Sequence, residues 1–334
     1  MSSQIHTYVA PPRERTDEGH IRRVGIEVEY GGIGVRETVP LVRAVLGGDV
    51  LHEDLTEAVI SVPELGDFRV EIDSTLFKDQ RILGLFGLES DDGESLSPFA
   101  ETVEGMLVRV ASGVIPHELI TPPIPWNVLH RLDPLWEKLP EAGARGTHES
   151  ILYAFGLHLN IEVPDLRVET LVAYLRAYLL LEEWIREQAQ IDWTRRAVLP
   201  YIDPFGESYR RKVLNPDYAP TMARFIEDYL EDNPTRNRSL DLLPIIATVD
   251  PEAIRGRVEQ EHLVRARPAF HYRLPNSELG RPQWSPAIDW NRWVQVEELA
   301  GLAPHSLLEL SHRWLRSAAA AEHEHDDGVP LQEH

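Results

Sequence analysis

The sequence predicts an α+β fold in one large domain, built on an antiparallel or mixed sheet. Short apolar runs typical of β-strands alternate with longer segments of helical periodicity. The segments between these runs differ in length, which disfavours a regular βαβ repeat, and no internal repeat is visible. The glycine signatures of Rossmann, P-loop and serine-hydrolase folds do not occur in a strand-to-helix context.

Six strands and six helices follow from these patterns. The strands have apolar residues in short runs or at alternate positions: 24–30, 58–62, 68–73, 117–121, 154–163 and 268–274. The helices have apolar residues at the spacing of a helical face: 37–46, 98–111, 128–137, 168–190, 221–229 and 304–320. Asp165 is predicted to cap the helix over 168–190, because its carboxylate can accept a hydrogen bond from a free backbone N–H.

Both ends of the chain are set apart from the predicted domain over 20–320. Residues 1–19 are polar and read as a flexible arm, and residues 321–334 read as a disordered acidic tail. The alternating His and Glu residues of that tail suit stray metal binding, but a mobile end lacks the fixed surroundings of a functional site. The segment over 275–291, rich in Pro and Trp, is a candidate lid.

Composition restricts the function. The formal net charge of −22 disfavours a nucleic-acid or anionic-membrane surface, because phosphate binding relies on Lys and Arg. The chain has 0 cysteines, which removes disulfides and thiolate chemistry and fits a reducing compartment. No run approaches the length of a membrane span or a signal peptide. We therefore expect a soluble, cytoplasmic protein.

The first predicted strand carries two carboxylates on one face. Glu27 and Glu29 alternate with apolar residues, so both side chains point to the same side of the strand. Two adjacent like charges there suit a cation, although a solvated edge strand with two surface glutamates explains the same pattern. Oxygen ligands of this kind suit Mg²⁺ or Mn²⁺.

Two further strands repeat this arrangement. In the strand over 68–73, Arg69, Glu71 and Asp73 share one face, although Arg69 and Glu71 can simply neutralise each other. The strand over 117–121 is followed by prolines that end the ladder, which places Glu118 near the point where the chain leaves the sheet. Each strand thus offers a carboxylate to a shared concave surface.

The strand over 154–163 adds a histidine. His158, Asn160 and Glu162 share one face, opposite leucines and an isoleucine. A neutral imidazole can ligate a metal, whereas a lone strand histidine is often only a structural residue.

The order of these motifs resembles that of the putative amidoligases of the carboxylate-amine ligase superfamily, relatives of glutamate-cysteine ligase and glutamine synthetase. The order is a Gly-x-Glu-x-Glu strand, an Asp-x-Ser/Thr-Leu strand end, Glu-Leu-Ile-Thr-Pro-Pro, a Gly-x-His strand and a late strand with Arg. The resemblance runs from about Gly25 to Arg273. It implies a curved, mainly antiparallel sheet with helices packed behind it, similar to the glutamine synthetase catalytic domain, and it implies ATP and Mg²⁺ bound in the concave face.

The resemblance also assigns roles to residues. By motif position, Glu27, Glu29 and Glu118 are similar to metal ligands, His158 is similar to a metal or phosphate ligand, and Asp73 lies in the Asp-x-Ser position near the substrate. Arg273 stands where the family has an arginine that meets the transferred phosphate.

Other positions match less closely. Arg238 lies in a segment similar to one that supplies cationic contacts, with Asp241 where Asn is usual. Arg210 and Lys212 are weaker candidates for nucleotide binding, because a short basic run is commonly a solvated loop. His271 replaces the metal-binding Glu of the late strand, which keeps a metal ligand, lowers the affinity for Mg²⁺ and favours a softer metal, or signals altered chemistry. Asn160 likewise replaces a second histidine.

The function implied is an ATP- and Mg²⁺-dependent ligase that joins a carboxylate of an amino acid or peptide to an amine through an acyl phosphate. Two alternatives stay open. A non-catalytic descendant would use the cleft to bind a peptide or nucleotide, and a metal-dependent hydrolase would use the carboxylates without ATP. The patterns do not define the oligomeric state.

Overall fold

The computed structural model describes residues 7–72, 116–147, 155–189, 203–302 and 304–326. The predicted helix over 98–111 and the candidate site residue Asp73 lie outside these ranges. No described helix is long and apolar enough to cross a membrane.

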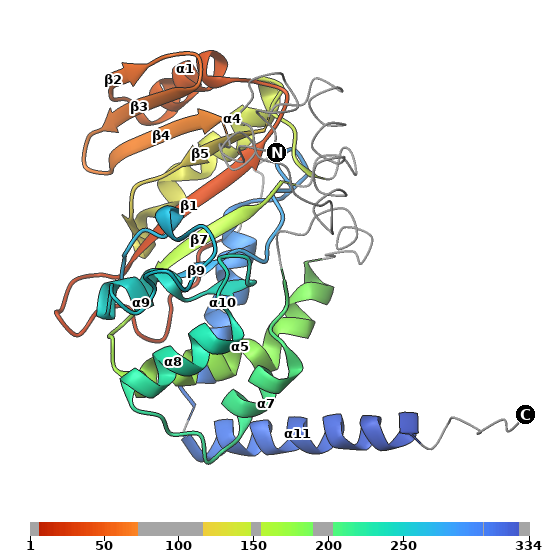
Figure 1. The fold of residues 1–334 in the computed structure, drawn as a ribbon. Coiled ribbons are helices and arrows are strands. Elements are labelled where there is room, and N and C mark those ends of the chain that lie inside the picture. The colour runs from red at the N-terminus through yellow and green to blue at the C-terminus, as the bar shows by residue number, and fades with distance from the viewer. Residues whose placement is uncertain (1–6, 73–115, 148–154, 190–202, 303, 327–334) are drawn as a thin grey trace, which may run out of the picture.

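The core element is a nine-stranded sheet in the order β2-β3-β4-β5-β1-β7-β9-β8, with the short β6 also paired to β1 (Figure 1). Neighbouring strands in it pair antiparallel. The strands are β1 (Arg23–Tyr30), β2 (Asp49–Glu53), β3 (Glu57–Val62), β4 (Gly66–Ile72), β5 (His117–Ile120), β6 (Ile124–Pro125), β7 (Leu157–Glu162), β8 (Leu240–Asp241) and β9 (Ala269–Tyr272). The predicted α+β class with a mainly antiparallel sheet is therefore confirmed.

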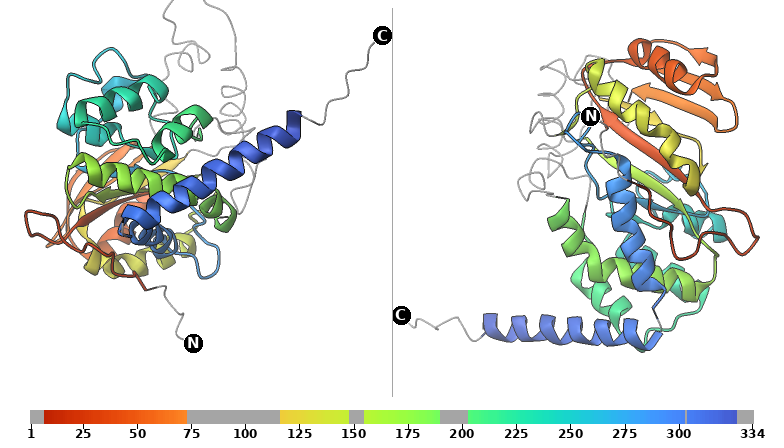
Figure 2. Two further views of the ribbon diagram at one scale, coloured as in Figure 1. Left: turned by 90° about the horizontal axis from the view of Figure 1, so that it is seen from below. Right: turned by 180° about the vertical axis from the view of Figure 1, so that it is seen from behind.

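Eight α-helices accompany the sheet in the described residues, with 3-10 turns at η1 (Trp126–Leu132) and η3 (Glu261–Leu263). The α-helices are α1 (Val35–Leu46), α4 (Asp133–Glu141), α5 (Val168–Gln188), α7 (Glu207–Leu214), α8 (Met222–Asp232), α9 (Leu243–Val249), α10 (Pro286–Ala300) and α11 (Pro304–Asp326). Seen from behind, α1, α4, α5 and α10 lie over one face of the sheet (Figure 2).

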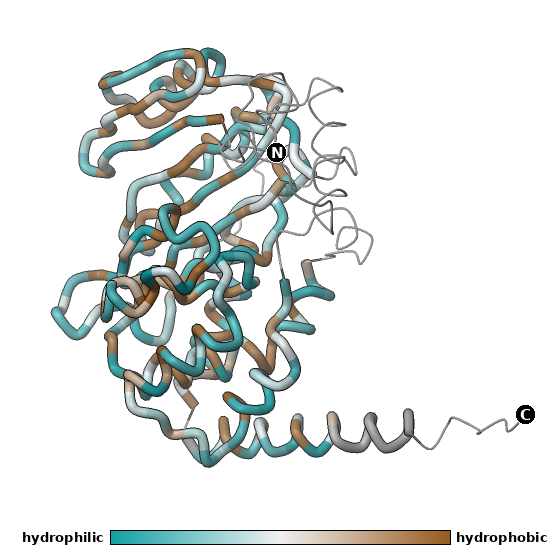
Figure 3. Tube along the Cα trace, viewed as in Figure 1, coloured by the Kyte–Doolittle hydropathy of each residue, from teal (hydrophilic) through white to brown (hydrophobic). Residues whose placement is uncertain are grey.

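Alternation along the strands separates a helix-covered face from a polar face. Val24, Ile26 and Val28 of β1 are almost fully buried, whereas Glu27 and Glu29, which alternate with them, are only partly buried. Hydrophobic and hydrophilic residues alternate along several strands in the same way (Figure 3). Because side chains of a strand point alternately to its two faces, the carboxylates are left on the side away from the helices.

Aromatic packing fixes β9 against the helices. Phe270 stacks on Tyr174 of α5 with ring centroids 5.4 Å apart, and it contacts Trp293 of α10 at 5.3 Å. Tyr272 contacts the same Trp293 at 5.5 Å. Because His271 lies between these two aromatic residues, its side chain is directed to the polar face.

A buried ion pair joins the start of β1 to α10. Arg22 donates two hydrogen bonds to the Glu297 carboxylate, each 2.7 Å long, and both residues are 1% exposed. Trp293 Nε1 donates a further hydrogen bond of 2.7 Å to Glu297. The charges are thus taken out of water with their hydrogen-bonding groups paired.

Several predicted boundaries differ from the structure. The helix predicted over 128–137 divides into η1 and α4, because Pro134 fits the first turn of a new helix and does not fit the interior of a continuous one. The prediction of Asp165 as a helix cap is wrong: Arg167 is the N-cap of α5, and Asp165 accepts from the backbone N–H of Arg167 at 2.9 Å before the helix begins. The short basic run that contains Arg210 and Lys212, for which a solvated loop was the alternative, lies in helix α7.

Residues 7–19, which belong to the predicted flexible arm, contact the rest of the molecule. Tyr8 is 8% exposed, Trp290 Nε1 of α10 donates 2.8 Å to the Val9 carbonyl, and Arg13 pairs with Asp165 at 2.6 Å. At the other end, α11 continues to Asp326, past the predicted start of the tail, and projects from the body (Figures 1 and 2).

The segment over 275–291 runs beside the start of β7. Leu157 N–H donates 3.0 Å to the Pro275 carbonyl, and Ser277 N–H donates 2.8 Å to the Phe155 carbonyl. Ser277 and Leu279 are fully buried. Helix α10 begins within the segment at Pro286. Movement of this segment as a lid stays a prediction.

Candidate functional site

The polar face of the sheet gathers five predicted metal ligands from four strands. Glu27 of β1 lies opposite His158 of β7, and Glu29 of β1 lies opposite Glu118 of β5. His271 of β9 lies one strand further, opposite Asn160 of β7. These residues form two overlapping groups whose potential ligand atoms lie within 4.8 Å of one another: Glu27, His158 and His271 in one, Glu29, Glu118 and His158 in the other.

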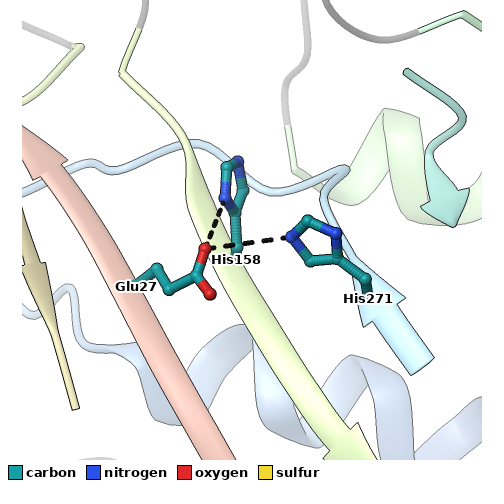
Figure 4. A group of neighbouring side chains, drawn as sticks. All are labelled: Glu27, His158 and His271. Carbon is teal, nitrogen blue, oxygen red and sulfur yellow. Dashed lines mark hydrogen bonds and ion pairs between the residues drawn. The ribbon is translucent and has the colours of Figure 1, made fainter. Parts of the chain in front are cut away.

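Glu27 is the centre of the first group (Figure 4). Its Oε2 lies 3.1 Å from His158 Nδ1 and 3.8 Å from His271 Nε2. Its Oε1 accepts a hydrogen bond of 2.6 Å from Asn160 Nδ2. Burial alone raises the pKa of Glu27, but its interactions with His158 and His271 outweigh burial and hold that pKa well below its usual range. Glu27 is therefore ionised and oriented toward both rings.

His158 connects the two groups, because each of its ring nitrogens faces a different carboxylate. Nδ1 faces Glu27, and Nε2 lies 3.8 Å from Glu29 Oε1. The other oxygen of Glu29 accepts 2.8 Å from the Gly156 N–H. The Gly156 position itself is crowded, since a Cβ there would lie 2.8 Å from His158 Nε2. A glycine is thus required for the ring to occupy this position.

His271 is held from behind by a carboxylate. Its Nδ1 lies 3.4 Å from Oδ2 of Asp241, which is directly opposite in β8 and 1% exposed. Its Nε2 is buried and, within the described part of the chain, has no hydrogen-bond partner. The planes of the His158 and His271 rings are nearly perpendicular, with centroids 5.3 Å apart.

Arginines lie beside this group. Arg267 Nη2 donates 2.5 Å to Asn160 Oδ1, and Arg273 Nη1 donates to the Arg236 carbonyl and, at 3.3 Å, to Asn237 Oδ1. Burial and the charge of Arg273 lower the pKa of Arg236, an effect that Asp241 and Glu27 oppose. Among the described residues, none makes a hydrogen bond or ion pair with the Arg236 guanidinium. A partly buried, unpaired guanidinium suits an anion.

Three predicted cationic residues are engaged elsewhere. Arg238 donates 2.6 Å to the Pro204 carbonyl and 3.1 Å to the Asp232 carbonyl. Arg210 pairs with Glu182 of α5 at 3.0 Å and lies over the Trp314 ring. Lys212 pairs with Asp228 and Asp232, at 3.3 and 2.9 Å. The contacts of Arg210 and Lys212 join α7 to α5 and α8, and both α7 and α8 lie away from β1 (Figure 1). The structure does not bring Arg210 or Lys212 to the carboxylates.

Sequence reasoning missed Arg236 and Arg267, and it treated Asp241 only as a departure from a motif. Arg236 lies in the same basic segment as the predicted Arg238, and that was the only signal for it in the sequence. Arg267 lies just before β9, the strand that carries the predicted ligand His271. Its position next to that strand could have indicated a place near the site. Nothing in the sequence pairs Asp241 with His271, because that pairing depends on the register of β8 and β9.

Comparison with known proteins identifies the family. No curated protein and no solved structure matches the chain. The family model described as "Putative amidoligase enzyme" matches residues 20–295, a range that includes all five residues of the two overlapping groups. The chain therefore belongs to the family of putative amidoligase enzymes, which suggests a ligase-type activity.

Proposed function

We propose that the protein is an ATP- and divalent-cation-dependent ligase that joins a carboxylate of an amino acid or peptide to an amine. The observation that carries this proposal is the meeting of Glu27, Glu29, Glu118, His158 and His271 on one polar face, beside the arginines that flank β9. Carboxylates and imidazoles hold cations, and arginines hold phosphate oxygens, so together they suit a metal–nucleotide complex. The glutamine synthetase-like form of the sheet belongs to the same proposal.

The reaction needs few covalent steps from the protein. The substrate carboxylate attacks the γ-phosphorus of ATP, the bond to the β-γ bridging oxygen breaks, and ADP leaves with that electron pair. The amine then attacks the acyl phosphate carbon, loses a proton, and inorganic phosphate leaves. Catalysis of this kind consists mainly of positioning and of screening negative charge.

The residues of the site suit those two tasks. Bound Mg²⁺ or Mn²⁺ would supply charge neutralisation at the phosphates. Glu27, Glu29, Glu118, His158 and His271 would hold such ions, and Nε2 of His271, which has no hydrogen-bond partner among the described residues, is directed at Glu27. Asn160 and the Gly156 N–H orient the two glutamates. Arg236 and Arg273 are the residues available to the transferred phosphate, and Asp73 stays a predicted substrate contact.

Calorimetric titration with a nonhydrolysable ATP analogue, with and without Mg²⁺ or Mn²⁺, tests the proposal. We expect binding that requires the divalent cation, followed by phosphate release from ATP when a suitable carboxylate and amine are both present. Metal-dependent binding without turnover over a broad substrate screen would instead indicate a non-catalytic binding protein. Metal-stimulated hydrolysis with no nucleotide affinity would indicate the hydrolase alternative.

A further inference from the structure

The group around Glu27 is richer in nitrogen than a site for Mg²⁺ should be. Two of its three ligand atoms are imidazole nitrogens, and only one is a carboxylate oxygen. Mg²⁺ prefers oxygen ligands and retains several waters, whereas imidazole suits Fe, Co, Ni, Cu and Zn. Two histidines and one carboxylate on one side of an ion are a donor set typical of transition metals.

The buried ring of His271 is arranged as a metal ligand. Its side chain is 5% exposed, and its Nε2 lacks a hydrogen-bond partner in the described residues while lying 3.8 Å from Glu27 Oε2. Leaving a buried polar atom unpaired is unfavourable. A cation between His271 and Glu27 would remove this cost, because it would accept the lone pair of the nitrogen and the charge of the carboxylate.

Asp241 determines which nitrogen of His271 is available. Its Oδ2 lies 3.4 Å from His271 Nδ1, and its Oδ1 accepts 2.8 Å from the Leu243 N–H, which fixes the carboxylate. A carboxylate accepts hydrogen bonds, so in a metal-bound His271 the proton on Nδ1 would face Asp241 and the lone pair of Nε2 would be left for the ion. Carboxylate–histidine–metal arrangements of this kind orient the ring and raise the basicity of the ligand.

Distances in the group fit a small divalent ion. Metal–ligand bonds of about 2.1 Å place neighbouring ligand atoms about 3.0–3.4 Å apart. Glu27 Oε2 lies 3.1 Å from His158 Nδ1 and 3.8 Å from His271 Nε2, so small side-chain movements would complete the site. The neighbouring group contributes two carboxylates and one histidine, which leaves it the more suitable of the two for Mg²⁺.

We propose that Glu27, His158 and His271 form a transition-metal site, with Asp241 as the positioning residue of His271. The proposal deepens the ligase function and rests on it only for the role of the ion in the reaction. Selective metal binding itself is measured without any reaction. The two carboxyl-bearing strands β1 and β8 thus hold His271 between a ligand on one side and a hydrogen-bond acceptor on the other.

Metal selectivity in the full-length protein tests this proposal. Co²⁺ is the probe, because its visible absorption reports ligand number and nitrogen ligation directly. The background carries His323→Ala, His325→Ala and His334→Ala, which removes the three histidines of the tail as stray ligands. Chelator-treated protein is titrated with Co²⁺, and Mg²⁺ is then added as a competitor. We expect Co²⁺ to bind in the Glu27 group and to resist displacement by about a hundredfold excess of Mg²⁺.

Variants assign the site. His271→Glu should lower the Co²⁺ affinity and raise the Mg²⁺ affinity, because it replaces a nitrogen ligand with an oxygen ligand. Asp241→Asn should weaken Co²⁺ binding about 10–100-fold, as loss of a partner that orients a ligand does. His52→Ala is the matched control: His52 also has a carboxylate partner, Asp54 at 3.1 Å, but it is 54% exposed on the edge strand β2. This control should bind Co²⁺ like the parent protein.

Each outcome decides the proposal. Equal affinity for Mg²⁺ and Co²⁺, or Co²⁺ affinity unchanged in His271→Glu, would overturn it while leaving the ligase function intact. Selective Co²⁺ binding in a protein that does not bind the ATP analogue would support the metal site and contradict the ligase function. If His271→Glu does not fold, judged by circular dichroism, His158→Gln at the partly exposed second histidine replaces it, with the same expected loss of Co²⁺ affinity.

Discussion

At the scale of single residues, Glu27 connects the metal and nucleotide parts of the site. Glu27→Gln removes the charge and keeps the volume, so we expect metal affinity and metal-dependent binding of the ATP analogue to fall together, by at least about tenfold. Calorimetry measures both, and circular dichroism should show an unchanged fold. Glu53→Gln on the edge strand β2 is the matched control, because Glu53 is exposed. Unchanged nucleotide affinity in Glu27→Gln would rule out a metal bridge at this residue.

Arg236 and Arg238 make opposite predictions, although they are two residues apart. Arg236→Gln removes a guanidinium that has no partner among the described residues, so we expect nucleotide affinity to fall about 10–100-fold with little change in thermal stability. Arg238→Gln breaks hydrogen bonds to the Pro204 and Asp232 carbonyls, so we expect the melting temperature to fall instead. Titration and thermal unfolding of both variants check this; equal nucleotide affinity of Arg236→Gln and the parent protein would contradict it.

At the scale of elements, the attachment of β1 to α10 depends on the buried Arg22–Glu297 pair. Glu297→Gln leaves the Arg22 charge buried without a counter-charge, so we expect the free energy of unfolding to fall by about 3–5 kcal/mol. Denaturant titration measures this change. Glu252→Gln is the control, because its pair with Arg255 is exposed on both sides and surface pairs contribute about 0–1 kcal/mol. Similar losses in both variants would show that burial of the pair has no special effect.

Helix α4 begins with a buried acid, Asp133. Its pKa is raised, although the helix dipole alone would lower it. A carboxylate at a helix N-terminus is normally favoured, but burial, with a smaller contribution from Glu137, raises the pKa of Asp133 to about 7. The folded state thus binds a proton more tightly than the unfolded state, whose carboxyl titrates near 3.8. The stability that this proton contributes is fully present below the unfolded pKa and is lost as pH rises through about 7.

Asp133→Asn removes this titration. We expect the variant to show a flatter decline of the free energy of unfolding between about pH 4 and pH 7 and to be more stable than the parent protein at pH 8. Urea unfolding at a series of pH values measures both quantities. Identical pH profiles for the two proteins would show that Asp133 keeps an ordinary pKa in the folded state.

At the scale of the whole molecule, the sheet brings together residues that are distant in the chain. Glu27 lies near the start of the described residues and His271 near the end, yet only β7 separates their strands. Antiparallel pairing places Glu27 opposite His158, and Asn160 opposite His271. The candidate site therefore exists only when β1, β5, β7 and β9 are paired in this register, since a shift of one residue would turn these side chains toward the helices.

Much of this site could be predicted because alternation along a strand is a local property. Apolar residues between Glu27 and Glu29, around Glu118 and beside His158 determine which side chains point away from the core. The side-chain directions of Arg236 and Arg267 could not be predicted in this way. Both residues lie outside the strands, where no period determines the direction of a side chain. Helices α7 and α9 were missed because they are short and their apolar pattern is weak against flanking turn residues.

The sequence by itself determined the α+β class, the polar face and five of the residues on it, because the period of two in the strands is written into consecutive residues. Only the tertiary structure decided that Asp241 holds His271, that Arg236 rather than Arg238 lacks a partner among the described residues, and that Val9 of the N-terminal segment contacts α10. These facts depend on strand register and on contacts between distant segments, which are set by the packing of the whole chain.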